Sequence, residues 1–256
     1  TAKPSPSPPD QSNSAHYRGA APNDELAGVV GGSGGRLAGL AVLPWQYPTE
    51  AAVELQRAVG IGLRGAMAYS NVAGRHIDDP DFESIFATAA SLDVPLLLHP
   101  AMPLSAPTLG DYGLSCAVGF LFDSTTAILR LILSGLFDRH PGLKIIVGHA
   151  GSLLPQLAGR LDLEQARGMI FGAHAKRSSL SSDYLKCLYT DTAGGSVSAV
   201  VSALRLFGSG HVMFGTDFPF WSHDVNLNVL ESLPLSAEEM QAVRSQVARE
   251  LFRLDG

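Results

Sequence analysis

Four polar residues stand at the ends of short apolar runs, and their types suit metal binding and proton transfer. His99 ends the run PLLLH, His149 ends KIIVGH, Asp191 ends LYTD and Asp217 ends VMFGTD. Neutral imidazole nitrogens and carboxylate oxygens are ligands for divalent transition metals such as zinc and manganese. A histidine that holds no metal titrates near neutral pH and can carry a proton. These residues therefore predict a metal site with acid–base chemistry.

Asp191 and two further polar residues allow more than one interpretation. Asp191 opens the turn DTAGG, so its carboxylate can line a substrate site or cap the next helix. Arg64, inside GLRGAMAY, can present its planar guanidinium group to a substrate carboxylate or pair with an internal acid. His223 follows Asp217 closely and can line the same pocket. The remaining histidines are expected at surface or structural positions: His16, His76, His140, His174 and His211.

Composition excludes several classes of function. The chain has 256 residues, of which 46% are hydrophobic and 16% charged, a balance typical of a globular protein with a large core. Eighteen Lys and Arg against 24 Asp and Glu leave a net charge of −6 without a basic run, which argues against nucleic acid as a partner. Two cysteines make no disulfide framework and favour a cytoplasmic setting.

No membrane association is expected. The most apolar region, STTAILRLILSGLF, is interrupted by Arg130 and is expected to be too short to cross a bilayer. The start of the chain, TAKPSPSPPDQ, lacks the apolar stretch of a signal peptide.

One alternation of elements must position the candidate residues. Six short apolar runs, each followed by an amphipathic stretch, predict six βα units with parallel strands. The runs lie at 37–43, 62–69, 94–99, 144–149, 187–192 and 211–217. Because the carboxyl ends of parallel strands meet at one face, the polar residues at those ends are expected to converge. A closed (β/α)8 barrel has eight units, so the pattern fits an open sheet or a barrel without its beginning.

The boundaries of the domain follow from local composition. Residues 1–24 are rich in Pro, Ser and Asn and are expected to be irregular, whereas residues 25–256 form a single α/β domain. A helix is predicted over 24–30, and the glycine run after it is expected to be a flexible turn. Thr49 and Ser236 are predicted to cap the helices that follow them.

Several segments, taken together, resemble a known family. The HP pair after an apolar strand, the stretch LRLILSGLFDRHPGLKIIVGHAGSLLPQLAGRLD and the motif VMFGTDFPF occur here in that order. They resemble the amidohydrolase-related proteins of the aminocarboxymuconate-semialdehyde decarboxylase type, over the chain from about Asp24 to its end. Within that type the chain is similar to non-oxidative decarboxylases of γ-resorcylate and salicylate.

The resemblance implies a fold and roles for three residues. The family has a distorted (β/α)8 barrel of the TIM type, a single divalent metal, zinc or manganese, at the carboxyl ends of the strands, and a homodimeric assembly. His99 matches the metal-binding histidine of the HP motif. Asp217 matches the aspartate of the GTD motif, which binds the metal and takes part in proton transfer. His149 matches the histidine that acts as base or orients the substrate.

The sequence departs from the family at its beginning. The family's first strand carries two further ligands as H-x-H or E-x-H, and no such pair is present here, where His16 stands alone in SAHYR. This departure agrees with the count of six units. We therefore expect that the first part of the family barrel, with two ligands, is absent from this chain.

Three functions remain open at this stage. The first is a carbon–carbon lyase that decarboxylates a small aromatic or conjugated carboxylic acid, with Asp217 or His149 as the proton donor to the ring carbon. The second is a hydrolase of a lactone, ester or amide, with His149 as the base. The third is a catalytically silent barrel that serves as a binding or scaffold protein, because two missing ligands would weaken metal binding. A homodimer is expected in each case.

Overall fold

A parallel sheet whose strands follow chain order forms the centre of the molecule. The computed structural model describes residues 20–170 and 181–254. Within them, five strands pair in the order β1-β4-β5-β6-β7, and Ala41 adds a parallel bridge to Ala66. The strands are β1 (Ala66–Tyr69), β4 (Leu96–His99), β5 (Ile145–Val147), β6 (Tyr189–Asp191) and β7 (Val212–Met213). This unreversed order is that of a TIM-type barrel wall, as predicted, and differs from a doubly wound sheet, whose order reverses.

The register of the strands fixes which residues share an edge. Tyr69 pairs with His99, and Val147 pairs with Thr190. Asp191 in turn pairs with Met213. The carboxyl ends of all five strands therefore meet at one edge, which we call the carboxyl edge, and the chain leaves each strand there.

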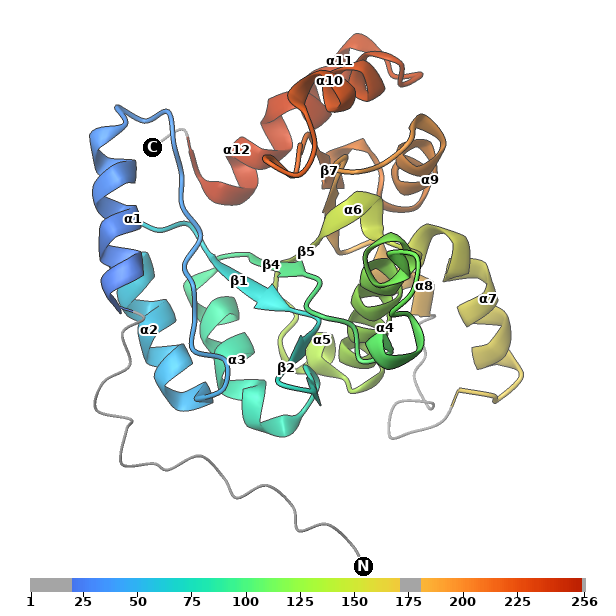
Figure 1. Cartoon of the computed structure of the whole chain (residues 1–256), viewed down its shortest axis with the longest axis horizontal. Helices are drawn as coiled ribbons and strands as arrows, with labels where there is room; N and C mark the ends of the chain where they lie inside the picture. The colour runs from blue at the N-terminus through green and yellow to red at the C-terminus, as the bar shows by residue number, and fades with distance from the viewer. Residues whose placement is uncertain (1–19, 171–180, 255–256) are drawn as a thin grey trace, which may run out of the picture.

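Helices and a hairpin surround the sheet. Figure 1 shows α2 and α3 beside β1 and β4, with α4, α7 and α8 on the other side of the molecule. The helices are α1 (Ala20–Gly32), α2 (Pro48–Gly60), α3 (Glu83–Leu92), α4 (Phe120–Leu133), α5 (Leu136–Arg139), α7 (Leu154–Ala166), α8 (Ser181–Leu185), α9 (Val197–Phe207), α10 (His223–Glu231), α11 (Ala237–Gln241) and α12 (Val247–Phe252). The hairpin consists of β2 (Asn71–Val72) and β3 (Arg75–His76). The segment labelled α6 (Gly148–Gly151) contains left-handed residues.

The core between β1 and its helices is built on one tryptophan. Trp45 is 1% exposed and meets Phe82 and Phe86 edge-on, with ring centroids 5.9 and 5.7 Å apart. Its indole N–H donates to the carbonyl oxygen of Met67 on β1 at 2.9 Å. The large apolar ring is therefore buried without leaving its polar atom unpaired.

The amino end of the described chain is more regular than its composition indicates. α1 begins at Ala20, so the expectation that residues up to 24 are irregular is wrong for 20–24, while residues 1–19, including His16, lie outside the described residues. Asn23 is fully buried, donates to Glu54 at 2.6 Å and exchanges two hydrogen bonds with the backbone of Val42. These bonds tie α1 to α2 and to the segment just after Ala41.

The apolar region around α4 is longer than expected. Helical residues run without a break over Ser115–Leu133, which is long and apolar enough to cross a membrane by length and composition. The expectation that this region is too short is therefore wrong. However, Ile128, Leu131 and Ile132 are buried in the core, and the buried carboxylate of Asp123 accepts bonds from Asn71 and from the Leu104 amide. These contacts make it a core helix of the domain.

Candidate metal centre

Three of the predicted residues converge at the carboxyl edge. His99 ends β4, His149 follows β5 and Asp217 follows β7. One ligand atom from each side chain lies within 4.8 Å of the corresponding atoms of the other two. The Nε2 atom of His149 is 3.7 Å from Oδ2 of Asp217, and the rings of His99 and His149 are 5.7 Å apart. All three side chains are half-buried, so the group remains partly accessible to solvent.

The side-chain hydrogen bond of His99 leaves its other ring nitrogen available as a metal ligand. Its Nδ1 atom lies 3.0 Å from the carbonyl oxygen of Pro100, which can only accept, so Nδ1 carries the proton and Nε2 keeps its lone pair. Partial burial, and then the proximity of His149, lower the pKa of His99 below its usual value. Both effects favour the neutral imidazole that a metal requires.

His149 is held by a strained backbone. Residues His149, Ala150, Gly151 and Ser152 all have positive φ, between 54° and 74°. Such angles are unfavourable for residues with a Cβ atom and persist only where surrounding contacts enforce them. The Nδ1 atom of His149 is buried and has no hydrogen-bond partner among the described residues.

The donor set of this group fits a divalent transition metal. Two imidazoles and one carboxylate from separate strands offer the nitrogen and oxygen ligands that zinc and manganese accept. The Nε2 atom of His149 faces Oδ2 of Asp217 at 3.7 Å, and the other ring nitrogen, Nδ1, is buried without a hydrogen-bond partner among the described residues. His99 and Asp217 can hold the ion, and His149 lies beside them.

Asp191 reaches the same region but contacts backbone. It is half-buried at the end of β6, and its Oδ1 accepts from the amides of His149 at 2.9 Å and Ala193 at 3.1 Å. Removal from solvent raises the pKa of Asp191, while the charge of His149 and these N–H bonds act in the opposite direction. It lies outside the group of three possible ligands.

The structure separates Arg64 from the site. β1 begins at Ala66, and Arg64 precedes it at the amino ends of the strands, where it lines a small cavity with Asp93 and Arg253. The group of His99 lies at the opposite edge. The structure therefore does not bring Arg64 together with the candidate metal ligands, because Arg64 lies before β1 rather than at the carboxyl end of that strand.

Aromatic side chains follow Asp217 at the carboxyl edge. His223 is exposed at the start of α10 and stacks on Phe218, with ring centroids 4.8 Å apart. Trp221 is 46% exposed. A Cβ atom on Gly194 would lie 3.4 Å from Nε1 of Trp221 and 3.5 Å from Cδ2 of His149, so both rings adjoin this glycine. Sequence reasoning missed Trp221, although the aromatic run FPFW after Asp217 signalled it.

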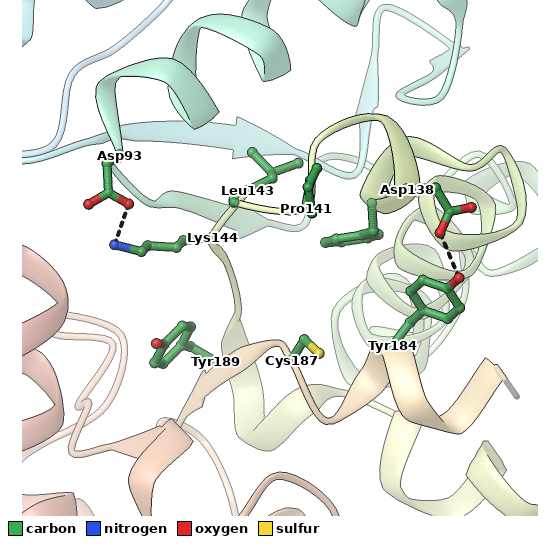
Figure 2. A pocket seen from close by; sticks show the side chains of 10 residues that line it. Asp93, Asp138, Pro141, Leu143, Lys144, Tyr184, Cys187 and Tyr189 are labelled. Atoms are coloured by element: carbon green, nitrogen blue, oxygen red, sulfur yellow. Dashed lines mark hydrogen bonds and ion pairs between the residues drawn. The ribbon is translucent and has the colours of Figure 1, made fainter. Parts of the chain in front are cut away.

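A larger cavity of about 630 Å³ lies at the other end of the strands. In Figure 2, Lys144 pairs with Asp93 on one side of it and Tyr184 bonds Asp138 on the other, while Cys187 projects between them. Lys144 directly precedes β5, so this cavity opens at the amino edge and is separate from the candidate metal centre. The charged and polar groups of these four side chains are therefore paired with one another.

The other predicted histidines have structural partners. His140 contacts Glu83 at 2.6 Å, and His211 stacks on Tyr189 with ring centroids 4.5 Å apart. His76 lies in the hairpin strand β3, paired with Asn71. His174 lies outside the described residues.

Comparisons with known proteins agree on one family. The family described as "Amidohydrolase" matches residues 13–254. The chain is 31% identical over 250 residues to decarboxylase orsB of Emericella nidulans, which covers 91% of this chain and 75% of that protein. It is also 31% identical over 248 residues to a gamma-resorcylate decarboxylase of Rhodococcus jostii, with the same two shares.

Solved structures that resemble this chain are also decarboxylases by name. A 5-carboxyvanillate decarboxylase, LigW, from Sphingomonas paucimobilis aligns with a TM-score of 0.86 at 30% identity, over 91% of this chain and 72% of that one. A dihydroxybenzoic acid decarboxylase from Polaromonas, with bound manganese and the inhibitor 2-nitroresorcinol, aligns with a TM-score of 0.86 at 30% identity, over 96% of this chain and 77% of that one.

Proposed function

The chain belongs to the amidohydrolase family, and from this premise we propose that it is a metal-dependent, non-oxidative decarboxylase of a small aromatic carboxylic acid. The observation that carries the proposal is the convergence of His99, His149 and Asp217 from three separate strands. Relatives and solved structures with 30% or 31% identity are decarboxylases of aromatic acids by name, and one of these structures holds manganese.

The residues divide into two roles. His99 and Asp217 would hold the metal, which is zinc or manganese. When bound, the ion would stabilise the negative charge that develops on the substrate. His149, whose Nε2 faces Asp217 at 3.7 Å, is placed to exchange a proton with that carboxylate or with the substrate.

The proton step is written for an aromatic acid with a hydroxyl group beside its carboxylate. Asp217 or His149 delivers a proton to the ring carbon that bears the carboxylate, and a new C–H bond forms. The bond to the carboxylate then breaks, its electron pair restores the aromatic ring, and CO₂ leaves. The exposed rings of Phe218, Phe220 and Trp221 lie next to Asp217 in the chain and offer flat surfaces for such a substrate.

Metal content and CO₂ release test the proposal together. Mass spectrometry of the purified 256-residue chain is expected to find about one zinc or manganese ion per chain. With Mn²⁺ and 2,6-dihydroxybenzoate we expect release of CO₂ and resorcinol, which a chelator abolishes. Asp217→Asn and His149→Asn should lower kcat by about 100-fold or more.

His211→Asn is the matched control for these variants. His211 precedes β7, the strand that ends before Asp217, but lies at the amino edge, so its replacement should leave kcat per folded chain within about twofold. A chain that binds neither metal would contradict the proposal, as would one that binds metal but hydrolyses a lactone without releasing CO₂ from any hydroxybenzoate tested.

We further propose a homodimer in a reducing, cytoplasmic setting. The segment from β4 into α4 exposes apolar side chains, among them Met102 at 65%, Val118 at 48% and Phe122 at 53%. Such a group of side chains is typical of a covered surface. Cys116 and Cys187 are both exposed and unpaired, which suits reducing conditions. Light scattering on the purified chain should give twice the monomer mass, and a monomer mass at micromolar concentration would contradict the dimer.

A further inference from the structure

We propose that Asp191 and Thr192, at the carboxyl end of β6, are positioning residues that set how far His149 lies from Asp217. The inference rests on the proposed function because it concerns the same metal site. It goes beyond that function because it assigns roles to two residues that neither hold the metal nor transfer the proton. It also replaces the expectation that Asp191 contacts the substrate.

The sheet itself cannot hold His149 and Asp217 in place. The ladder between β5 and β6 ends at Val147 and Thr190, and the ladder between β6 and β7 ends at Asp191 and Met213. Both functional residues come after these last pairs. Because β6 lies between β5 and β7, the end of β6 adjoins the segments that carry both side chains.

Asp191 binds the backbone of the turn that carries His149. Its Oδ1 accepts from the His149 amide at 2.9 Å, with the Ala150 amide 3.5 Å away, and both donors lie in the left-handed turn. This turn is the strained segment that aims the imidazole. A carboxylate that binds the amides of this turn stabilises backbone angles that the residues would otherwise avoid.

Thr192 binds the backbone of the loop that carries Asp217. Its buried hydroxyl donates to the carbonyl oxygen of Gly215 and accepts from the amide of the same residue, each at 3.2 Å. A Cβ atom on Gly215 would lie 2.9 Å from Cβ of Asp191, so the loop packs directly against β6. Gly215 is followed closely by Asp217, and fixing the glycine therefore fixes the start of the loop that carries the carboxylate.

Three variants with one matched control test this inference. Asp191→Asn removes the charge and keeps one oxygen acceptor, Asp191→Ala removes both, and Thr192→Val removes the hydroxyl. Thr190→Val is the control, because Thr190 lies on the same strand, is equally buried and also bonds a neighbouring carbonyl, that of Val147 at 2.6 Å. Val147 stays paired in the ladder without this bond, whereas Gly215 lies beyond the last paired residues of β6 and β7.

The first measurement is the dissociation constant for Mn²⁺ on folded protein, with kcat and KM for 2,6-dihydroxybenzoate. Asp191→Ala and Thr192→Val are expected to weaken Mn²⁺ binding by about tenfold or more and to lower kcat with little change in KM. Asp191→Asn should recover part of the loss. Thr190→Val should lower the unfolding temperature but leave the Mn²⁺ affinity within about twofold.

The second measurement is amide hydrogen exchange without metal. Loss of the Asp191 carboxylate should speed exchange at His149, and loss of the Thr192 hydroxyl should speed exchange at Gly215, each more than Thr190→Val does. Unchanged exchange and unchanged Mn²⁺ affinity in both variants would overturn the inference. A raised KM with unchanged Mn²⁺ affinity would overturn it in favour of substrate contact. A wild-type chain that binds no Mn²⁺ while these amides respond would overturn the proposed function instead.

Discussion

His99 and His149 present different hydrogen-bond states within one site. The Nδ1 of His99 donates to the Pro100 carbonyl, which fixes both its ring orientation and its tautomer. The Nδ1 of His149 has no such partner within the described chain, so its ring is oriented through the backbone turn beneath it. A ring whose tautomer is fixed suits a permanent ligand, and a ring whose tautomer is free suits proton exchange.

Arg64 gives a test of the separation between the two edges of the sheet. Arg64→Ala is expected to leave kcat/KM for an aromatic acid within about twofold, because its side chain lies at the amino edge beside Asp93. Steady-state kinetics on the purified variant check this. A tenfold rise in KM would place the guanidinium group at the substrate and contradict the placement.

The candidate ligands could be predicted from sequence because position and residue type were both informative. His99, His149 and Asp217 each follow a short apolar run, and parallel strands bring such ends together. The contacts of Asp191 could not be predicted, because its carboxylate turns to the backbone of the turn that follows the neighbouring strand β5. Only the register and the left-handed turn determine which amides it meets.

At the scale of elements, the start of α11 shows a capping interaction that the sequence signals clearly. Ser236 accepts from the Glu239 amide at 3.2 Å, and the Glu239 carboxylate accepts from the Ser236 amide at 2.9 Å. Thr49, predicted to play the same part for α2, does not cap it. That helix starts at Pro48, whose fixed φ suits the first helical position, so Thr49 already lies inside the first turn.

These two residues form a matched pair for a stability measurement. Ser236→Ala is expected to lower the free energy of unfolding by about 1 kcal/mol, because two backbone donors at the helix start lose their arrangement. Thr49→Ala should change it by less than about 0.5 kcal/mol. Urea titration of both variants checks the difference, and equal losses would show that the capping box contributes nothing particular.

The first predicted strand illustrates why strand ends are hard to predict. The run 37–43 contributes only the bridge at Ala41, although Ala41 exchanges backbone bonds with Gly65 and Met67. A Cβ atom on Gly39 would lie 2.8 Å from the side chain of Leu63, so this part of the backbone packs closely against its neighbours. The apolar pattern predicts burial correctly but not the number of paired residues.

At the scale of the whole molecule, an ion pair links helices that are distant in the chain. Glu83, at the start of α3, receives two bonds from Arg139 at 2.8 Å and contacts His140 at 2.6 Å. The Arg139 guanidinium group is the main reason that the pKa of Glu83 is lowered to about 2, and burial opposes it. The lowered pKa means that folding favours the charged carboxylate.

This pair predicts a dependence of stability on acid pH. The contribution of Glu83 is complete above its unfolded pKa of 4.5 and is lost as the pH falls toward its folded pKa of about 2. Because both side chains are more than a third exposed, solvent limits the effect to about 1 kcal/mol or less. The stability difference between wild type and Glu83→Gln should shrink from pH 6 to pH 2. A difference that stays constant over this range would contradict the linkage, and the subtraction removes the effect of the other carboxyl groups.

The fold class could be predicted from the alternation of six apolar runs with amphipathic stretches, and the chain order of the strands confirms it. The amino boundary of the domain could not be predicted, because residues 20–24 combine Pro22 with two polar residues and show no apolar periodicity. Asn23 becomes core only through the specific acceptors that Glu54 and Val42 provide. A buried amide of this kind depends on partners far away in the chain.

The unreversed order of the sheet also sets a sequence of events during synthesis. A chain that leaves the ribosome with its amino end first can add each new strand to one already made, since every strand pairs with its predecessor in the sheet. His99 emerges with the second strand of this series, but Asp217 follows the last. A nascent chain therefore lacks the carboxylate of the site until β7 and the residues after it have been made, and in the proposed enzyme metal capture follows the synthesis of β7.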